Sequence, residues 1–255
     1  MLLTTLAWFD IIRVIMEKEY LKDTQRGGFW GSQACQAPFV ALMTNLKKDG
    51  FFIEIGSNDP IHINNTYKLE KVFGWKGLMF ELKKERFEKS YSEHRSSQAI
   101  WGDATKHNYK KIFEEHNVPK VVDYLQLDID PAHVTLEALN NLNENIMDDY
   151  KFSVVTYEHD FAHTGNPIHR LESREIFEAR GYSPVFKDVA NNQTHWVFED
   201  WYVHPDLVDM EIVEKLQFKN KDLYQNTPNE QTKPSNYGHL LNDKVIIAQE
   251  IDFVL

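Results

Sequence analysis

Carboxylate and imidazole side chains gather in two short segments of this chain, LDIDP at residues 127–131 and YEHDFAH at residues 157–163. Carboxylate oxygens are the ligands that Mg²⁺ prefers. A carboxylate or an imidazole can also act as a general base, which removes a proton from a reacting group. Both segments follow apolar runs that are typical of buried strands. The side chains that could do this chemistry are Asp128, Glu158, His159 and Asp160.

Two hypotheses about these four side chains stay open. In the first, Asp128 with Glu158 or Asp160 binds a divalent cation such as Mg²⁺, and His159 orients or deprotonates the substrate. In the second, no metal takes part, and His159 with Asp128 forms the catalytic group. Both hypotheses use Asp128 and His159, and only the first needs Glu158 or Asp160.

A loop with a single glycine follows the apolar run at FFIEIGSNDP, residues 51–60. A dinucleotide site usually needs G-x-G-x-x-G, because a pyrophosphate must approach the backbone at the start of a helix. Here Gly56 is alone and Pro60 lies in the loop. The segment therefore favours a ligand without phosphates, such as S-adenosylmethionine, over a nicotinamide dinucleotide. A plain turn glycine is the alternative.

Acidic residues also end the next two apolar runs. Glu81 ends KGLMFEL, 25 residues beyond Gly56, where an acid can accept hydrogen bonds from both ribose hydroxyls. Asp103 lies in QAIWGDA, where it can accept from an adenine amino group. The alternatives are a surface glutamate beside two lysines and a turn-forming Gly-Asp pair.

Strand and helix patterns alternate along the chain and predict how these residues are placed. Five strand-helix units run from Phe51 to Gly181, with helix caps expected at Asn65 and at Asp130, ahead of Pro131. Two more strands at 182–189 and 194–203 form a hairpin, and a late strand is expected in 244–251. The pattern predicts an α/β fold with a doubly wound, seven-stranded, mostly parallel sheet and helices on both faces. Ligands of such sheets bind at the carboxyl ends of the strands.

The composition limits the possible partners. A net charge of −11 over 255 residues argues against nucleic-acid binding, and no segment is apolar for the roughly 20 residues that span a bilayer. Cys35 is the only cysteine, which excludes an internal disulfide framework and fits a reducing compartment, the cytoplasm. We expect an amphipathic helical extension at 1–30, a main domain at 31–209 and an extension at 210–255 packed on it. The first segment could also pair with a second subunit in a homodimer or cover the substrate site.

Five segments in order resemble the FkbM-type family of S-adenosylmethionine-dependent methyltransferases, between about residue 31 and residue 205. They are SQACQ (32–36), FFIEIGSNDPIHINNTYKLEKVFGWKGLMFEL (51–82), VDYLQLDID (122–130), FSVVTYEHD (152–160) and DWYVHP (200–205).

The resemblance implies a class I methyltransferase (Rossmann-like) fold and O-methylation of a hydroxyl on a sugar, glycan or other small acceptor. Pro60 and Pro131 depart from the family pattern, which has glycine at both places, and proline fixes φ and removes a donor. The residues that match the cofactor side, or lie directly beside it, are Glu54, Gly56, Ser57, Asn58, Glu81, Asp103, Ala104 and Asp128.

Several interpretations remain beside this one. Trp196, Trp201 and Tyr202 could stack on a sugar or pack an edge strand, and His204 could face the acceptor or lie in the hairpin. A binding module that has kept the fold without catalysis is one alternative function. A nicotinamide-dependent oxidoreductase is another, and the missing glycine-rich motif argues against it.

Overall fold

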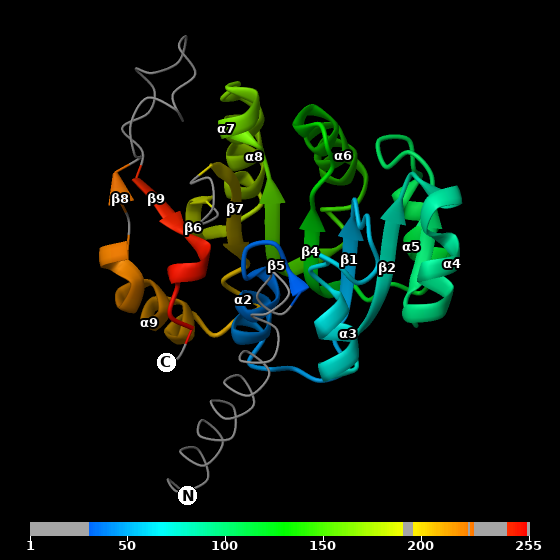
Figure 1. Ribbon diagram of the computed structural model, residues 1–255, viewed down its shortest axis with the longest axis horizontal. Helices are drawn as coiled ribbons and strands as arrows, with labels where there is room; N and C mark the ends of the chain where they lie inside the picture. The colour runs from blue at the N-terminus through cyan, green and yellow to red at the C-terminus, as the bar shows by residue number, and fades with distance from the viewer. Residues whose placement is uncertain (1–30, 191–195, 224, 227–243, 254–255) are drawn as a thin grey trace, which may run out of the picture.

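The computed structural model describes residues 31–190, 196–223, 225–226 and 244–253, and a nine-stranded sheet forms its centre (Figure 1). The strand order is β3-β2-β1-β4-β5-β7-β6-β9-β8. The strands are β1 (Phe51–Ile55), β2 (Lys76–Glu81), β3 (Gln98–Trp101), β4 (Val121–Leu127), β5 (Lys151–Glu158), β6 (Ser183–Ala190), β7 (Val197–Val203), β8 (Gln225–Asn226) and β9 (Lys244–Ile247).

Strands β1 to β5 run parallel, and β7 runs antiparallel to both of its neighbours, β5 and β6. The first seven strands thus have the order 3-2-1-4-5-7-6 with one reversed strand, which is the class I methyltransferase (Rossmann-like) arrangement. The predicted fold is confirmed, and so are the β6–β7 hairpin and the late strand, which is β9. The hairpin turn at 191–195 lies outside the described residues.

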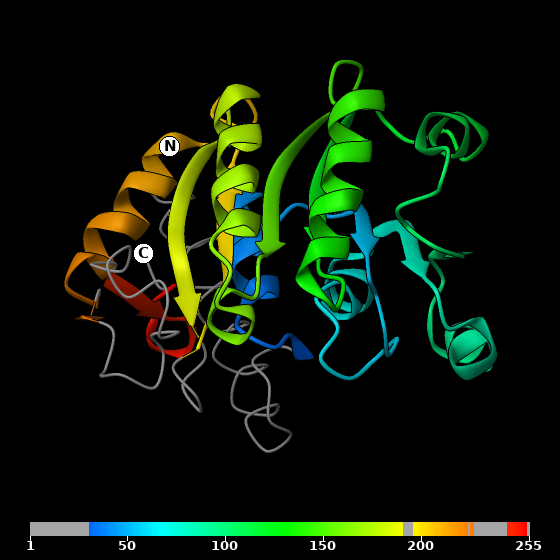
Figure 2. The ribbon, with the colours of Figure 1, turned by 90° about the horizontal axis from the view of Figure 1, so that it is seen from above.

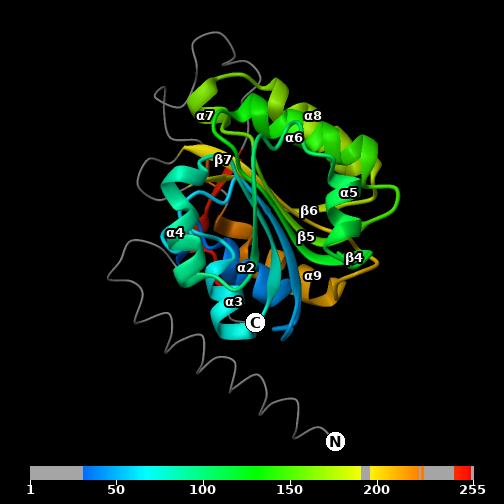
Figure 3. The ribbon, with the colours of Figure 1, turned by 90° about the vertical axis from the view of Figure 1, so that its right-hand side faces the viewer.

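Helices cover both faces of the sheet (Figures 2 and 3). One face packs against α5, α6 and α8, and the other against α2, α3, α4 and α9. Within the described residues, no helix is long and apolar enough to cross a membrane. The helices are α2 (Gln36–Met43), α3 (Tyr67–Phe73), α4 (Lys84–His94), α5 (Tyr109–Glu115), α6 (Ala132–Asn145), α7 (Phe161–Thr164), α8 (Ile168–Ala179) and α9 (Met210–Asn220).

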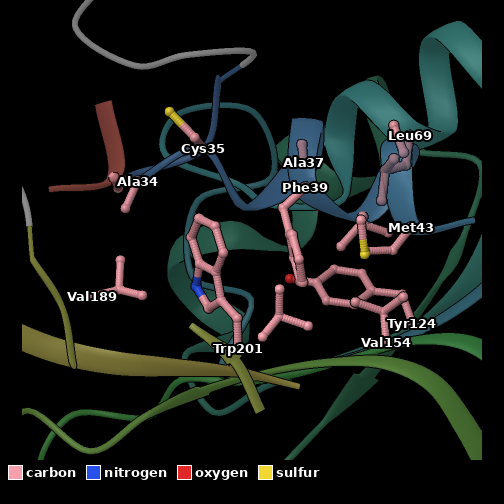
Figure 4. Close-up of a cluster of buried hydrophobic side chains, with 14 of the residues drawn as sticks. Ala34, Cys35, Ala37, Phe39, Met43, Leu69, Tyr124, Val154, Val189 and Trp201 are labelled. Atoms are coloured by element: carbon pink, nitrogen blue, oxygen red, sulfur yellow. The ribbon is translucent and has the colours of Figure 1, made fainter. Parts of the chain in front are cut away.

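The core under α2 fixes how the segment before β1 lies on the sheet. Phe39 of α2 reaches down between Trp201 of β7 and Tyr124 of β4 (Figure 4). The rings of Phe39 and Trp201 stack with centroids 4.7 Å apart, and all three side chains are buried. Burial of each such side chain contributes about 1.5–3 kcal/mol to stability. The strong packing brings residues 31–36 to the carboxyl edge of β5, beside Glu199.

Two predicted helix caps are wrong. Helix α3 begins at Tyr67, and its backbone N–H donates to Oδ1 of Asn64 rather than of Asn65. Helix α6 begins at Ala132 with no side-chain cap, and Asp130 is exposed. The predicted helix ends at Gly74 and Gly181 are confirmed, since both glycines have positive φ directly after α3 and α8.

The predicted extensions are described only in part. Residues 1–30 lie outside the described residues. Helix α9 packs against α2 and β6, and β9 pairs with β6. Val213 and Leu216 of α9 are buried in the same core as Phe39.

Candidate active site

Strands β1, β2, β4 and β5 end along one edge of the sheet, the upper edge in Figure 1. Gly56 follows β1 there with φ +85°, in the left-handed region that favours glycine. A Cβ at this position would lie 1.8 Å from the carbonyl oxygen of Asp128. The ends of β1 and β4 therefore approach so closely that residue 56 must be glycine.

The loop after Gly56 is held by side chains rather than by further glycines. The Tyr91 hydroxyl donates to Oγ of Ser57 at 2.5 Å and also lies 3.0 Å from the Asn58 carbonyl. Asn58 adopts φ +46°, which asparagine tolerates better than most residues. The Asn64 amide donates to the carbonyls of Ser57 and Asp59, so it ties the two ends of the loop together.

Glu54 lies beneath this loop and is buried. Its carboxylate accepts hydrogen bonds from Oγ1 of Thr66 at 2.8 Å and from Nδ2 of Asn64 at 3.2 Å. Burial raises the pKa of Glu54 to about 7, although Arg95, with Nη1 4.0 Å away, acts in the opposite direction. The structure therefore places Glu54 as a support of the loop with a proton that is lost near neutral pH.

Glu81 and Asp103 lie at the same edge, at the ends of β2 and β3. Both Glu81 oxygens accept backbone N–H groups, from Asn58 at 2.9 Å and from Lys83 at 2.8 Å. Hydrogen bonds from Lys106 and Thr105 lower the pKa of Asp103 to about 2. Each Glu81 oxygen accepts one hydrogen bond and so has a second lone pair for a ligand. Oδ1 of Asp103 already accepts two hydrogen bonds from Thr105, so only Oδ2 of Asp103 has a lone pair left for a ligand. The carbonyl of neighbouring Ala104 accepts from Tyr109.

Asp128 and Glu158 form a pair of acids at the ends of β4 and β5, close enough for their carboxyl groups to share a hydrogen bond. Burial raises the pKa of both groups, and the nearby Asp128 raises that of Glu158 further. Glu199 of β7 lies opposite Glu158 in the sheet, and burial raises its pKa as well. Nε2 of Gln36 donates to Glu199 at 2.6 Å. Three adjacent strands, β4, β5 and β7, therefore carry acids at this edge, and few positive charges lie nearby to stabilise their ionised forms.

His159 lies apart from this acidic group, and its position does not suit the predicted general base. Its ring is fully buried, with Nδ1 accepting from the Phe161 N–H and Nε2 3.5 Å from Asp200. Burial alone would raise the pKa of Asp200, but the Arg174 guanidinium holds this pKa well below its usual range. His159 thus belongs to a buried charge network beside the site.

The same network contains a set of atoms with the spacing of a metal site. His159, Asp188 and Asp200 offer ligand atoms within 4.8 Å of one another. Both carboxylates are already paired with guanidinium groups, Asp188 with Arg170 at 2.7 Å and Asp200 with Arg174 at 2.7 Å. We therefore interpret this cluster as a set of structural ion pairs.

A cavity of about 280 Å³ opens beside Glu158. Trp196, which is 40% exposed, packs edge-on against His163 there, with centroids 5.6 Å apart. Among the described residues, the lining of this cavity contains three carboxylates and neither lysine nor arginine. The lining residues are Gln33, Asp130, Glu158, Asp160, His163, Trp196 and Phe198.

The structure separates the other predicted aromatic and imidazole candidates from this cavity. Trp201 and Tyr202 are buried in the cores on opposite faces of the sheet. His204 follows the far end of β7, where its N–H donates to Ser153 and its ring packs on Tyr182. Of the three aromatic residues predicted to stack on a sugar, only Trp196 lines the cavity.

Sequence reasoning missed Glu199, Gln33 and Arg95. Glu199 had a usable signal, because a charged residue within the apolar run WVFEDWYV is unusual for a buried strand. Arg95 is fully buried beneath the Gly56 loop, but in the sequence it follows an ordinary polar helix.

No family model matches the chain, and no curated protein matches it. Solved structures that resemble it include SAM-bound CalS10, an amino pentose methyltransferase from Micromonospora echinaspora, with 9% identity, a TM-score of 0.46 and coverage of 70% of this chain and 93% of that one. A methyltransferase from Pyrococcus furiosus has 15% identity, a TM-score of 0.41 and coverage of 65% and 80%. A TehB-like SAM-dependent methyltransferase from Corynebacterium glutamicum has 13% identity, a TM-score of 0.40 and coverage of 66% and 87%. At these values, the fold assignment rests on the strand order described above.

Proposed function

We propose that this protein is an S-adenosylmethionine-dependent O-methyltransferase of the FkbM type that methylates a hydroxyl of a sugar or glycan. One observation carries the proposal: the glycine turn after β1, the acid that ends β2 and the acidic cavity after β5 share one edge of a 3-2-1-4-5-7-6 sheet. We expect the cofactor to bind across β1 and β2 and the acceptor to bind in that cavity.

The charges on the cofactor side suit a sulfonium better than a pyrophosphate. Glu54, Glu81 and Asp103 are acids, and the loop residues Gly56, Ser57 and Asn58 are uncharged. A pyrophosphate needs converging N–H donors at a glycine-rich helix start. In this loop, the N–H groups of Gly56 and Ser57 both donate to the Phe80 carbonyl, and that of Asn58 donates to Glu81.

S-adenosylmethionine, when bound, supplies an electrophilic methyl group, so the chain itself must orient the acceptor and take up the hydroxyl proton. The Asp128–Glu158 pair suits the second task, because two carboxyl groups that hold one proton between them still have one carboxylate, which can take up the hydroxyl proton so that both become neutral. The same two oxygen-rich groups, with Asp160, fit Mg²⁺, which would lower the pKa of a hydroxyl bound to it. Proton transfer by the acids alone is the metal-free form of the proposal.

The cavity also favours a class of acceptor. Carboxylates accept hydrogen bonds from sugar hydroxyls, and the exposed Trp196 offers a face for an apolar sugar surface. The three lining carboxylates, with no lysine or arginine among the described lining residues, would repel a phosphate. We therefore expect neutral or cationic acceptors rather than sugar phosphates or nucleotide sugars. The lone, buried Cys35 fits a cytoplasmic setting.

Incubation with methyl-labelled S-adenosylmethionine and matched acceptors tests this function. The panel should contain a neutral sugar, the corresponding amino sugar and the corresponding sugar phosphate, each with Mg²⁺ and with a chelator. Label in an acid-stable ether of the neutral sugar is the expected result. Label only in the phosphate, or only on nitrogen, would contradict the proposed acceptor.

A further inference from the structure

The loop after β1 obtains its shape from a residue that lies far away in the sequence. Between Gly56 and Tyr67 the chain contains no further glycine, yet Asn58 and Ile63 both have positive φ. Such conformations cost about 1–2 kcal/mol each in residues other than glycine. Contacts from outside the loop must therefore stabilise its shape.

The Arg95 side chain makes these contacts. Arg95 follows α4, and its side chain is fully buried. Nη1 donates to the Pro60 carbonyl at 3.2 Å and to Oδ1 of Asn64 at 3.0 Å, and Nη2 donates to Oγ1 of Thr66 at 2.8 Å. One planar guanidinium thus contacts the loop at three points, a geometry that lysine cannot reproduce.

The other side of the guanidinium is fixed by Glu70 of α3. Nε of Arg95 donates to Oε2 of Glu70 at 3.1 Å, and Glu70 also accepts from the N–H groups of Ser96 and Ser97. Arg95 is therefore clamped before any ligand arrives.

A short chain of hydrogen bonds leads from Arg95 to the cofactor side of the loop. Asn64 accepts from Arg95 through Oδ1 and donates through Nδ2 to the Ser57 carbonyl and to Glu54. Because Arg95 fixes Asn64, it also fixes the backbone of Ser57, which directly follows the required glycine. Buried groups of this kind hold binding residues in place.

We propose that Arg95 is a positioning residue for the cofactor, which holds the Gly56–Thr66 loop in its binding shape. This inference rests on the proposed function, since it assumes that the loop binds S-adenosylmethionine. It predicts that loss of the guanidinium fork weakens cofactor binding even when the fold and the positive charge are kept.

Calorimetric titration with S-adenosylhomocysteine, combined with thermal unfolding, tests the proposal. Arg95→Lys keeps the charge and removes the fork, and we expect its Kd to rise by about tenfold to a hundredfold. Arg180→Lys is the matched control, because Arg180 makes similar bonds to Asn143 and Asp148 at the other end of α6 and should bind as the wild type does. Thr66→Val removes one Arg95 contact, and we expect a smaller loss, of about twofold to fivefold.

A chemical-rescue measurement separates positioning from general damage. In Arg95→Ala, added methylguanidinium should restore much of the S-adenosylhomocysteine affinity, whereas methylammonium at the same concentration should not. An Arg95→Lys protein with a lower melting temperature but an unchanged Kd would overturn the inference and leave the proposed function intact. If Arg95→Lys does not fold, unchanged binding by Thr66→Val would overturn it. A wild-type protein that does not bind would overturn both.

Discussion

The carboxyl groups of Asp128 and Glu158 lie close enough across the ends of β4 and β5 to share a hydrogen bond, although both are acids. Two carboxylates can do this only when one of them holds a proton, and burial favours that neutral form. Glu199 and Asp160 add further negative charge nearby. Loss of the shared proton at alkaline pH therefore destabilises the fold. Functional sites often reduce the stability of a protein in this way.

Glu158→Gln should stabilise the fold while it removes activity. The glutamine amide can donate permanently to Asp128, so the variant no longer needs a proton at high pH. We expect a gain of about 0.5–2 kcal/mol in the free energy of unfolding at pH 8, measured with denaturant. Glu144→Gln on the exposed side of α6 is the control and should change stability by less than about 0.5 kcal/mol. A less stable Glu158→Gln protein at pH 8 would show that the pair is not under strain.

Glu54 should make the wild type less stable as pH rises towards neutrality. Its pKa is about 7 in the folded chain and near the usual 4.5 in the unfolded chain. Below pH 4.5 both states hold the proton. Between the two values the unfolded chain releases it first, so stability falls and then levels off above pH 7.

The size of this effect is roughly 3 kcal/mol, from 1.36 kcal/mol per pKa unit. Unfolding measured from pH 5 to pH 8 should show a flatter profile for Glu54→Gln than for the wild type. The absolute stabilities should also differ, because the variant offers Asn64 and Thr66 a weaker hydrogen-bond acceptor than the carboxylate. The comparison therefore uses the slopes of stability against pH. Parallel slopes would mean that Glu54 is not held with a raised pKa.

Substitution by glutamine should reduce stability at His159 and leave it nearly unchanged at His163. His159→Gln changes a buried ring that contacts Asp200 and the Phe161 N–H, so it should cost about 1–3 kcal/mol of stability. His163→Gln changes an exposed ring on the cavity wall and should leave stability within about 0.5 kcal/mol. A stable, inactive His159→Gln protein would instead restore His159 as the predicted base.

Two glycines with the same φ of +85° allow a matched test of the close approach at β1. Gly181→Ala adds only backbone strain, because the nearest atom to its Cβ is 4.0 Å away, and should cost about 1–2 kcal/mol without affecting the cofactor. Gly56→Ala places a Cβ 1.8 Å from the Asp128 carbonyl. We expect it to cost more than about 4 kcal/mol and to abolish cofactor binding. Equal losses in the two variants would contradict the account of Gly56.

The sequence predicted the strands and the edge at which the site lies, because buried strands are apolar runs and acids at their ends are local signals. It did not predict that Asn64, rather than Asn65, accepts the N–H of Tyr67, the first residue of α3. Oδ1 of Asn64 also accepts from Arg95, 31 residues away, and such a distant partner leaves no local signal. The sequence also did not predict that the His159 side chain points into the buried charge network with Asp200. The N–H groups of His159 and Asp160 both donate to the Phe198 carbonyl, so a strand formed later in the chain decides how the end of β5 turns.

Calorimetric titration of the wild-type protein with S-adenosylhomocysteine, with Mg²⁺ and then with chelator, tests whether this sheet edge binds the cofactor. We expect micromolar binding at one site per chain in both conditions, since the proposed cofactor residues are the loop after β1 and the acids of β2 and β3. Tighter binding with Mg²⁺ would indicate a cation near the cofactor, as the metal-dependent form of the proposal expects. No heat of binding in either condition, from a protein that unfolds cooperatively, would contradict the claim that this sheet edge holds S-adenosylmethionine.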